Sequence, residues 1–202
     1  MKPYLKAVAQ VKKAWRRLTL KNVRYSNDYE KLNAVYAIPD PWIMKSQSEQ
    51  FRFSETNRLI LERFGRQGSI LEIGCGEGHQ SLFLQQVCKR LTGLDVSARA
   101  VMRARSRCPQ GEFLVGDIFL PEVAARAPFD LVIASEVLYY ISDVHGVLGR
   151  MRELGRNNLV TYFVGEMANL DPQVLSLPGA VSEMLEFENV RWRAVWWRGD
   201  QV

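Results

Sequence analysis

The sequence has few of the residues that hold disulfide-rich or metal-dependent proteins together. It contains three cysteines, Cys75, Cys88 and Cys108, and only two histidines, His79 and His145, in 202 residues. An odd number of cysteines without C-x-x-C spacing argues against a disulfide framework and favours a reducing compartment. Two isolated histidines do not supply the ligand spacing of a zinc site. We therefore expect a cytoplasmic protein without a bound metal.

Long hydrophobic runs and internal repeats are also missing. No apolar run approaches the roughly 18 residues that a membrane-spanning helix needs, so no transmembrane segment is expected. No repeated unit suggests an array. In contrast, 47% of the residues are hydrophobic, which is enough to bury a sizeable core without disulfides. These features together predict one soluble globular domain.

A glycine-rich motif behind a short apolar run is the most informative segment. The run 70–73 predicts a buried strand that contains Glu72, and glycine follows at positions 74, 76 and 78. Three glycines at alternate positions predict a tight turn with room for a ligand. Residues 80–87 are compatible with a helix, whose free N–H groups would face the same place. This order of elements predicts a nucleotide-type cofactor site.

Acidic residues at the predicted strand ends narrow the type of cofactor. Glu72 would repel the pyrophosphate of a dinucleotide, but it suits a ligand with an amino group and a sulfonium. Asp95 stands about 20 residues beyond the loop, where α/β folds bind ribose hydroxyls. Asp117 and Glu136 follow the next two predicted strands. Any one of these acids alone could also cap the following helix. The order in which these acids follow the predicted strands favours a doubly wound α/β sheet with a cofactor at its C-terminal edge.

These residues resemble the class I S-adenosylmethionine-dependent methyltransferases over residues 70–164. The resemblance implies a Rossmann-like, mostly parallel sheet and S-adenosyl-L-methionine as cofactor. It implies that Glu136 lies under the reacting centre. Tyr139 and Tyr140 follow the same predicted strand, so they are expected either to join Glu136 as catalytic residues that shape the acceptor pocket or simply to pack. Cys75 is expected to pack as a small loop residue. The cofactor-binding residues that the resemblance implies in this domain are Glu72, Gly74, Cys75, Gly76, Asp95, Val96, Asp117, Ile118 and Glu136.

A second resemblance covers the segment before the glycine motif. Asp40-Pro41-Trp42, Glu49-Gln50 and Thr56 are similar to the N-terminal region of the nodulation protein S group, which N-methylates an amino sugar. The resemblance implies that residues 25–64 fold over the cofactor as a lid. Together with a basic helix before it, this lid would form an N-terminal part at 1–64 that precedes a cofactor-binding domain at 65–202. Trp42 would offer an aromatic face to the sulfonium or anchor its turn. Arg52 would pair with the methionine carboxylate or lie on the surface of a helix that starts near residue 48.

The first 27 residues are basic and free of acids. Leu5, Val8, Val11, Trp15 and Leu18 recur at spacings of three and four, which predicts a basic amphipathic helix. Such a helix would pack on the domain, attach to an anionic membrane surface through Trp15 and its basic face, or contact nucleic acid phosphates. The eight basic residues before the first acid, Asp28, are Lys2, Lys6, Lys12, Lys13, Arg16, Arg17, Lys21 and Arg24.

The C-terminal part departs from the usual pattern of the methyltransferase class. We expect a helix around residues 180–187 and one strand at 190–197, so that the sheet has six strands or an irregular last one, and its C-terminal end is shortened. At least two of the three tryptophans in that strand are expected to pack in the core, although the set would also suit an edge or a partner surface.

The sequence as a whole predicts a methyltransferase for a small-molecule or saccharide acceptor, at an amino nitrogen or a hydroxyl oxygen. A nucleic-acid methyltransferase is an alternative that the basic N-terminus suggests. However, residues 135–138 lack the Asn/Asp-Pro-Pro-aromatic loop that holds a flipped base. A further alternative is a cofactor-binding scaffold without catalysis.

Overall fold

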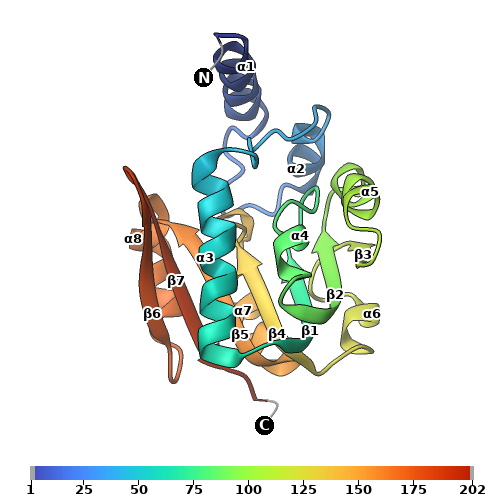
Figure 1. Ribbon diagram of the computed structural model, residues 1–202, viewed down its shortest axis with the longest axis vertical. Helices are drawn as coiled ribbons and strands as arrows, with labels where there is room; N and C mark the ends of the chain where they lie inside the picture. The colour runs from blue at the N-terminus through green and yellow to red at the C-terminus, as the bar shows by residue number, and fades with distance from the viewer. Residues whose placement is uncertain (1–2, 201–202) are drawn as a thin grey trace.

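The computed structural model describes residues 3–200, with side chains described from residue 7 onward. Its seven-stranded sheet has the order β3-β2-β1-β4-β5-β7-β6 (Figure 1). β7 runs antiparallel to β5 and β6, and β1 to β5 pair in parallel. The strand order reverses between β1 and β4, which is where such folds bind ligands. The strands are β1 Gln67–Ile73, β2 Cys88–Asp95, β3 Glu112–Val115, β4 Phe129–Ser135, β5 Gly155–Phe163, β6 Val181–Phe187 and β7 Val190–Arg198.

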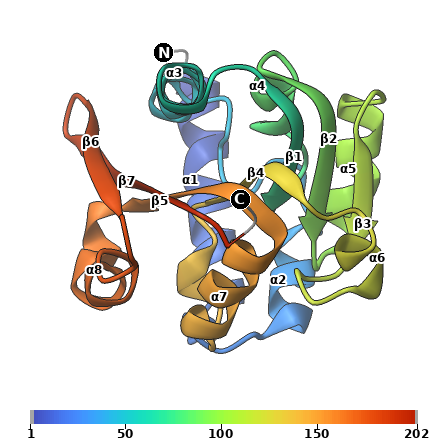
Figure 2. The same cartoon turned by 90° about the horizontal axis from the view of Figure 1, so that it is seen from below.

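Helices cover both faces of the sheet, as the end-on view in Figure 2 shows. One core contains residues of α3, α4 and α5, and the other contains residues of α6, α7 and α8. Short 3-10 turns stand at Leu138–Tyr140 and Val164–Glu166. The helices are α1 Pro3–Thr19, α2 Tyr29–Val35, α3 Gln47–Phe64, α4 Ser81–Leu84, α5 Ala98–Arg107, α6 Pro121–Ala124, α7 Val144–Leu154 and α8 Met167–Val174.

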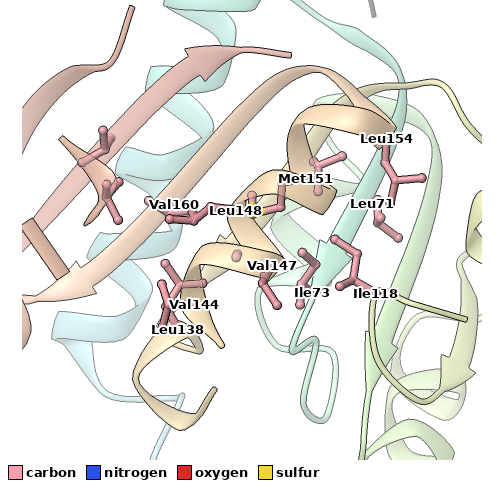
Figure 3. Packing of buried hydrophobic residues seen from close by; sticks show 14 of the residues in the cluster. Leu71, Ile73, Ile118, Leu138, Val144, Val147, Leu148, Met151, Leu154 and Val160 are labelled. Carbon is pink, nitrogen blue, oxygen red and sulfur yellow. The ribbon is translucent and has the colours of Figure 1, made fainter. Parts of the chain in front are cut away.

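The α7 helix illustrates how the sequence pattern builds this core. Its inward residues recur at spacings of three and four and pack with Leu71 and Ile73 of β1 (Figure 3). Asp143 caps its start by accepting a hydrogen bond from the Gly146 N–H at 2.8 Å. The inward residues of α7 are Val144, Val147, Leu148, Met151 and Leu154. Because the start of α7 is held by this cap, the loop between β4 and α7 is also held in place. That loop belongs to the site described below.

The helix predicted to start near residue 48 is α3. Ser46 accepts a hydrogen bond from the Glu49 N–H at 3.4 Å, which is one half of a capping box. Leu59 and Ile60 of α3 are fully buried against the sheet. Gly65 ends the helix with a φ of 72°, a conformation that favours glycine.

The predicted α/β fold class is confirmed, but its C-terminal end differs from the expectation. Residues 180–187 do not form a helix, because residues 181–187 form strand β6, which pairs along its length with β7. Leu185 points into the core while its neighbours Met184 and Glu186 are more exposed. Glu and Met favour helices in isolation, but tertiary pairing outweighs this preference at a sheet edge. The sheet therefore has seven strands and a complete terminal hairpin.

The three tryptophans of β7 all belong to the core. β7 lies between β5 and β6, so it is not an edge strand. Trp192, Trp196 and Trp197 are all buried, the first two on the α3 side and the third on the α7 side. The alternative role at an edge or a partner surface is wrong for these side chains.

The helix expected behind the glycine loop is shorter than predicted. α4 is a single turn, Ser81–Leu84, because the chain returns to the sheet at Cys88. A one-turn helix has little dipole, so a helix N-terminus does not explain ligand binding here. Among the described residues, no helix combines the length and the apolar character that crossing a membrane requires.

Candidate functional site

A cavity of about 390 Å³ lies at the C-terminal ends of β1, β2 and β4, under the segment 27–44. Its volume is in the range of small-molecule and cofactor sites. All of the residues predicted for the site line this one cavity, so the structure brings the complete set together. They are Trp42, Arg52, Glu72, Gly74, Cys75, Gly76, Asp95, Val96, Asp117, Ile118, Glu136, Tyr139 and Tyr140.

The glycine loop turns tightly at the end of β1. Gly74 and Gly76 have φ angles of 70° and 53°, which L side chains rarely adopt. A Cβ atom at Gly74 would lie 2.7 Å from Val137 Cγ2, and one at Gly76 would lie 2.9 Å from Tyr36 Oη. Any larger residue would therefore push the loop away from the lid and from the segment that follows β4.

Asp95 ends β2 and is buried under the loop. Its two carboxylate oxygens accept backbone hydrogen bonds from Gly76 N and Ser97 N, both at 2.8 Å. Burial raises the pKa of Asp95 to about 6, although these two N–H groups act in the opposite direction. Each oxygen can accept a further hydrogen bond. The carboxylate is thus oriented to bind hydroxyl groups of a ligand in the cavity.

Glu72 is the buried carboxyl group of β1 on the cavity wall. Ser81 Oγ donates a hydrogen bond to it at 2.5 Å. Burial raises its pKa to about 8, against the opposing effects of the Ser81 hydroxyl and the positive charge of Arg52. A cationic ligand group beside Glu72 would stabilise the ionised form of its carboxyl group.

Arg52 is 1% exposed, so the expectation that it might lie on the helix surface is wrong. Its Nε and Nη2 donate to Glu49 Oε2 at 3.0 and 2.7 Å, and its Nη1 donates to Gln80 Oε1 at 3.0 Å. A guanidinium carries five N–H donors, so two more can reach a ligand carboxylate. Arg52 is a buried cation that lines the cavity together with the acids Glu72, Asp95 and Glu136.

Glu136 follows β4 with a φ of 58°, an unusual backbone angle for a residue with a side chain. Its Oε2 accepts hydrogen bonds from Tyr139 Oη and Phe163 N, both at 3.2 Å, and its Oε1 lies 3.4 Å from Thr161 Oγ1. Burial raises its pKa to about 7, while nearby Arg52 lowers it. Strained backbone held by several partners is common at functional positions.

Aromatic side chains form the wall next to Glu136. The Tyr140 ring centroid lies 5.7 Å from that of Trp42 and 4.7 Å from that of Tyr139. Trp42 Nε1 donates to Tyr36 Oη at 3.0 Å, so Trp42 both anchors its turn and lines the cavity. Burial raises the pKa of Tyr139 well above its ordinary value, and the adjacent Glu136 raises it further. Tyr139 therefore acts as a neutral hydrogen-bond donor.

The far end of the cavity is formed by residues that follow β2 and β3. Asp117 accepts hydrogen bonds from Tyr29 Oη at 3.2 Å and from Phe119 N at 3.0 Å. Ile118 is buried and Val96 lies beside it on the cavity wall. This combination of a carboxylate and apolar side chains suits a flat ring with an amino group.

Cys75 packs as expected from its small size. It is buried, and its backbone N–H donates to Leu94 O at 2.8 Å. Burial raises the pKa of its thiol well above the ordinary value, and nearby Asp95 acts in the same direction. The thiol is therefore protonated and unreactive at neutral pH.

The buried carboxylate of Glu77, whose role the sequence analysis missed, fastens the lid to the glycine loop. Both carboxylate oxygens of Glu77 accept the Asp40 N–H at 3.0 Å, and Arg103 donates to Oε1 at 2.5 Å. Burial raises the pKa of Glu77, but the nearby His79 side chain and the hydrogen bonds from the Asp40 N–H and Arg103 outweigh this effect and lower the pKa to about 2.

Two lid tyrosines were also missed. Tyr29 and Tyr36 stand seven residues apart at the start and just past the end of α2, and both line the cavity. Their spacing places them on one face of a helix, with Leu32 between them. This signal was present in the sequence, but their contacts with Asp117 and Trp42 depend on tertiary structure.

The fold and the cavity together define a class of protein. One antiparallel strand in an otherwise parallel seven-stranded sheet, a glycine loop after β1 and acids after β2, β3 and β4 are the architecture of class I methyltransferases. The family model for nodulation protein S (NodS) matches residues 26–162. The chain therefore belongs to the nodulation protein S family.

Individual relatives agree with this assignment. The chain is 35% identical to nodulation protein S of Sinorhizobium fredii (strain NBRC 101917 / NGR234) over 130 residues, which cover 62% of this chain and 59% of the relative. It is 32% identical to nodulation protein S of Bradyrhizobium diazoefficiens over 131 residues, 63% of this chain and 61% of the relative. The chain thus spans about three fifths of the length of these relatives.

Solved structures show the same fold. N-methyltransferase NodS from Bradyrhizobium japonicum WM9, in complex with S-adenosyl-L-homocysteine, aligns with a TM-score of 0.68 and 23% identity, over 87% of this chain and all of that one. Magnesium protoporphyrin IX methyltransferase (ChlM) from Synechocystis PCC 6803, with bound S-adenosylmethionine, aligns with a TM-score of 0.61 and 14% identity, over 86% and 85% of the two chains.

Proposed function

We propose that this protein is an S-adenosylmethionine-dependent methyltransferase that acts on a small-molecule or saccharide amine. The observation that carries the proposal is the single cavity that brings together Glu72, Asp95 and Glu136 with Arg52. Buried carboxyl groups with raised pKa values are costly unless a ligand stabilises their charged forms. The membership of the nodulation protein S family supports the same reaction.

The residues present fit this cofactor group by group. The two further N–H donors of Arg52 suit the carboxylate of the methionine moiety, and Glu72 suits its amino group and the sulfonium. Asp95 keeps one acceptor on each oxygen for the two ribose hydroxyls. Asp117 suits the amino group of adenine, with Ile118 and Val96 against the ring.

S-adenosylmethionine supplies a methyl group on a positively charged sulfur. Transfer forms a bond from the methyl carbon to the acceptor atom while the carbon–sulfur electron pair stays on sulfur, so the protein must align the acceptor and exclude water. Glu136 is positioned to stabilise positive charge beside the acceptor and to hold its departing proton. The aromatic rings of Trp42, Tyr139 and Tyr140 would form the dry wall of the acceptor pocket.

The acidic character of the cavity favours a nitrogen acceptor over an oxygen acceptor. The carboxyl groups of Glu72, Asp95 and Glu136 line the cavity together with Arg52, and carboxylates attract an amine. An amino sugar is our specific proposal, because the structurally similar NodS of Bradyrhizobium japonicum is named an N-methyltransferase. A neutral sugar hydroxyl would gain less from these charges.

A methyl-transfer screen tests the proposal. Glucosamine and short amino-sugar oligomers with one free amine should accept a methyl group, and their N-acetylated forms should not. The N-acetylated compounds are matched controls because they differ at the reacting nitrogen alone. Transfer to hydroxyl groups of both forms would reassign the acceptor atom, and cofactor binding without transfer to any acceptor would support a non-catalytic scaffold instead.

A further inference from the structure

Helix α1 has one face that packs on the lid. Trp15 Nε1 donates to Val35 O at 3.0 Å, Arg16 Nη1 donates to Trp42 O at 3.2 Å, and Lys12 lies 3.4 Å from Asp40 Oδ2. The Trp15 ring packs against the cluster that contains Val35. Trp15 therefore faces the protein, which removes it from the membrane role considered for it on the sequence alone. Lys2 lies outside the described residues.

Beside the packed face, α1 carries a stripe of apolar residues that faces solvent. Ala7, Val11, Ala14 and Leu18 recur at spacings of four, three and four, so they line one side of the helix. Val11 is 66% exposed and Leu18 is 77% exposed. Figure 1 shows α1 extending beyond the lid at one end of the molecule. We call these four residues the outer stripe.

Positive charge borders the outer stripe on one side. Arg17 is exposed three residues after Ala14, so it adjoins the stripe on the helix surface. Exposed Lys13 lies one turn before Arg17, and exposed Lys21 follows the helix. No acid precedes Asp28 in the sequence. Two copies of α1 packed through this face would place like charges against one another, which is unfavourable. Charge complementarity therefore favours an anionic partner for this face.

We propose that the outer face of α1 binds the surface of an anionic lipid membrane. An apolar stripe beside basic residues is the arrangement of helices that lie in the membrane interface, where apolar side chains enter the acyl boundary and cations meet the headgroups. Nucleic acid fits less well, because phosphates would bind Lys13 and Arg17 but would leave Val11 and Leu18 without an apolar contact.

This attachment would orient the proposed methyltransferase toward the lipid surface. The arrowheads of the parallel strands in Figure 1 point toward the end of the molecule that carries α1. The cofactor cavity lies at the same ends of the strands. Lys12 and Arg16 link α1 directly to Asp40 and Trp42 of the lid. The cavity would then face acceptors held at a membrane.

Co-sedimentation of the full chain with vesicles tests the proposal. Vesicles of phosphatidylcholine with phosphatidylglycerol should bind the protein on the order of tenfold better than vesicles of phosphatidylcholine alone. The double variants Val11→Glu/Leu18→Glu and Lys13→Glu/Arg17→Glu should each lose on the order of tenfold in binding to the anionic vesicles. Met102→Glu, which changes an apolar side chain on α5 that is 62% exposed, should bind like the unchanged protein.

Thermal melting and binding of S-adenosyl-L-homocysteine should be unchanged in both double variants, which separates failure of this proposal from failure of the proposed function. Equal binding to both kinds of vesicle, or full binding by Val11→Glu/Leu18→Glu, would overturn the proposal. Salt-sensitive binding to RNA or DNA that Lys13→Glu/Arg17→Glu abolishes and Val11→Glu/Leu18→Glu preserves would assign the face to nucleic acid instead.

Discussion

The cofactor cavity and helix α1 carry charge in opposite ways. In the cavity, Glu72, Asp95 and Arg52 are buried and are held by one, two and three side-chain hydrogen bonds respectively. On α1, Lys13 and Arg17 are exposed beside apolar side chains. The family match begins at residue 26, so it includes the cavity and not α1. Buried charged groups that are fixed by hydrogen bonds indicate a site for a small ligand. Exposed charges beside an apolar stripe indicate contact with a larger surface.

Replacement of Glu136 by Gln should give the largest effect on the cavity. The variant keeps the size of the side chain but loses the negative charge beside the acceptor, so methyl transfer should slow by on the order of a hundredfold or more. Affinity for S-adenosyl-L-homocysteine should change by only a few-fold. Single-turnover kinetics and calorimetry measure the two quantities, and unchanged kinetics would remove Glu136 from the reacting centre.

The matched variant for this experiment is Glu153→Gln, which changes an exposed carboxylate that pairs with Arg150 on the surface of α7. It should leave both quantities unchanged. Lys13→Glu/Arg17→Glu on α1 should also leave both unchanged in solution. A loss of transfer in the α1 variant without vesicles would contradict the separation of the two regions.

Replacement of Asp95 by Ala should mainly weaken cofactor binding. The substitution removes two predicted hydrogen bonds to ribose and frees the N–H groups of Gly76 and Ser97, so the loss should be about 1–3 kcal/mol. Titration calorimetry with S-adenosyl-L-homocysteine measures it. A folded Asp95→Ala protein that binds as tightly as Glu112→Ala, an exposed acid at the start of β3, would exclude Asp95 from the site.

Arg52→Lys should have a smaller and more selective effect. Lysine keeps the positive charge but loses the planar fork that binds a carboxylate with two hydrogen bonds. Affinity for S-adenosyl-L-homocysteine should fall by about tenfold, while affinity for 5′-methylthioadenosine, which lacks the carboxylate, should change little. Because Arg52 also pairs with Glu49, thermal melting must confirm folding. An equal loss for both ligands would indicate a purely structural role.

The smallest effect should be the pH dependence of the preference for S-adenosylmethionine over S-adenosyl-L-homocysteine. Burial raises the pKa of Asp95 to about 6, of Glu136 to about 7 and of Glu72 to about 8. These groups become negative as pH rises from about 6 to 8, so affinity for the sulfonium cofactor relative to its neutral sulfide product should rise by a few-fold. Calorimetry with both ligands across this range measures the ratio, and a constant ratio would contradict these assignments.

The same shifts predict how stability without cofactor depends on pH. For each of the three carboxyl groups, the pKa in the folded state lies above the pKa in the unfolded state. The contribution of each group to folding stability is therefore complete below about pH 4 and is lost as the pH rises through its folded-state pKa. Glu77 acts in the opposite direction, because its pKa is lowered to about 2, and its contribution is lost in acid. Glu72→Gln should reduce the loss of stability between pH 5 and 8, as thermal melting would show.

Much of the cavity was predictable because its residues lie in local motifs. Glu72, Asp95 and Glu136 each stand at a strand end, and parallel strands bring their C-terminal ends to one edge. The strands themselves followed from short apolar runs. The helix α3 was expected to start near residue 48, and it begins at Gln47.

The failures concern residues whose role depends on distant partners. Residues 181–187 were assigned to a helix because their pairing with β7 is invisible in their own composition. The sequence left open whether Arg52 lies on the surface or in the cavity, because its buried position depends on a hydrogen bond to Gln80 from the loop after β1. Trp15 was grouped with Val11 and Leu18 in one apolar stripe, and its contact was left open between the domain and a membrane, because its hydrogen bond to Val35 O depends on tertiary structure.

The central claim is that the glycine loop and the acids around it bind S-adenosylmethionine. Calorimetric titration of the purified, folded protein with S-adenosylmethionine and with S-adenosyl-L-homocysteine tests it most directly. We predict saturable binding of both ligands with one site per chain, weakened in Asp95→Ala and unaffected in Lys13→Glu/Arg17→Glu. No heat of binding with either ligand, together with no change in melting temperature, would contradict the account.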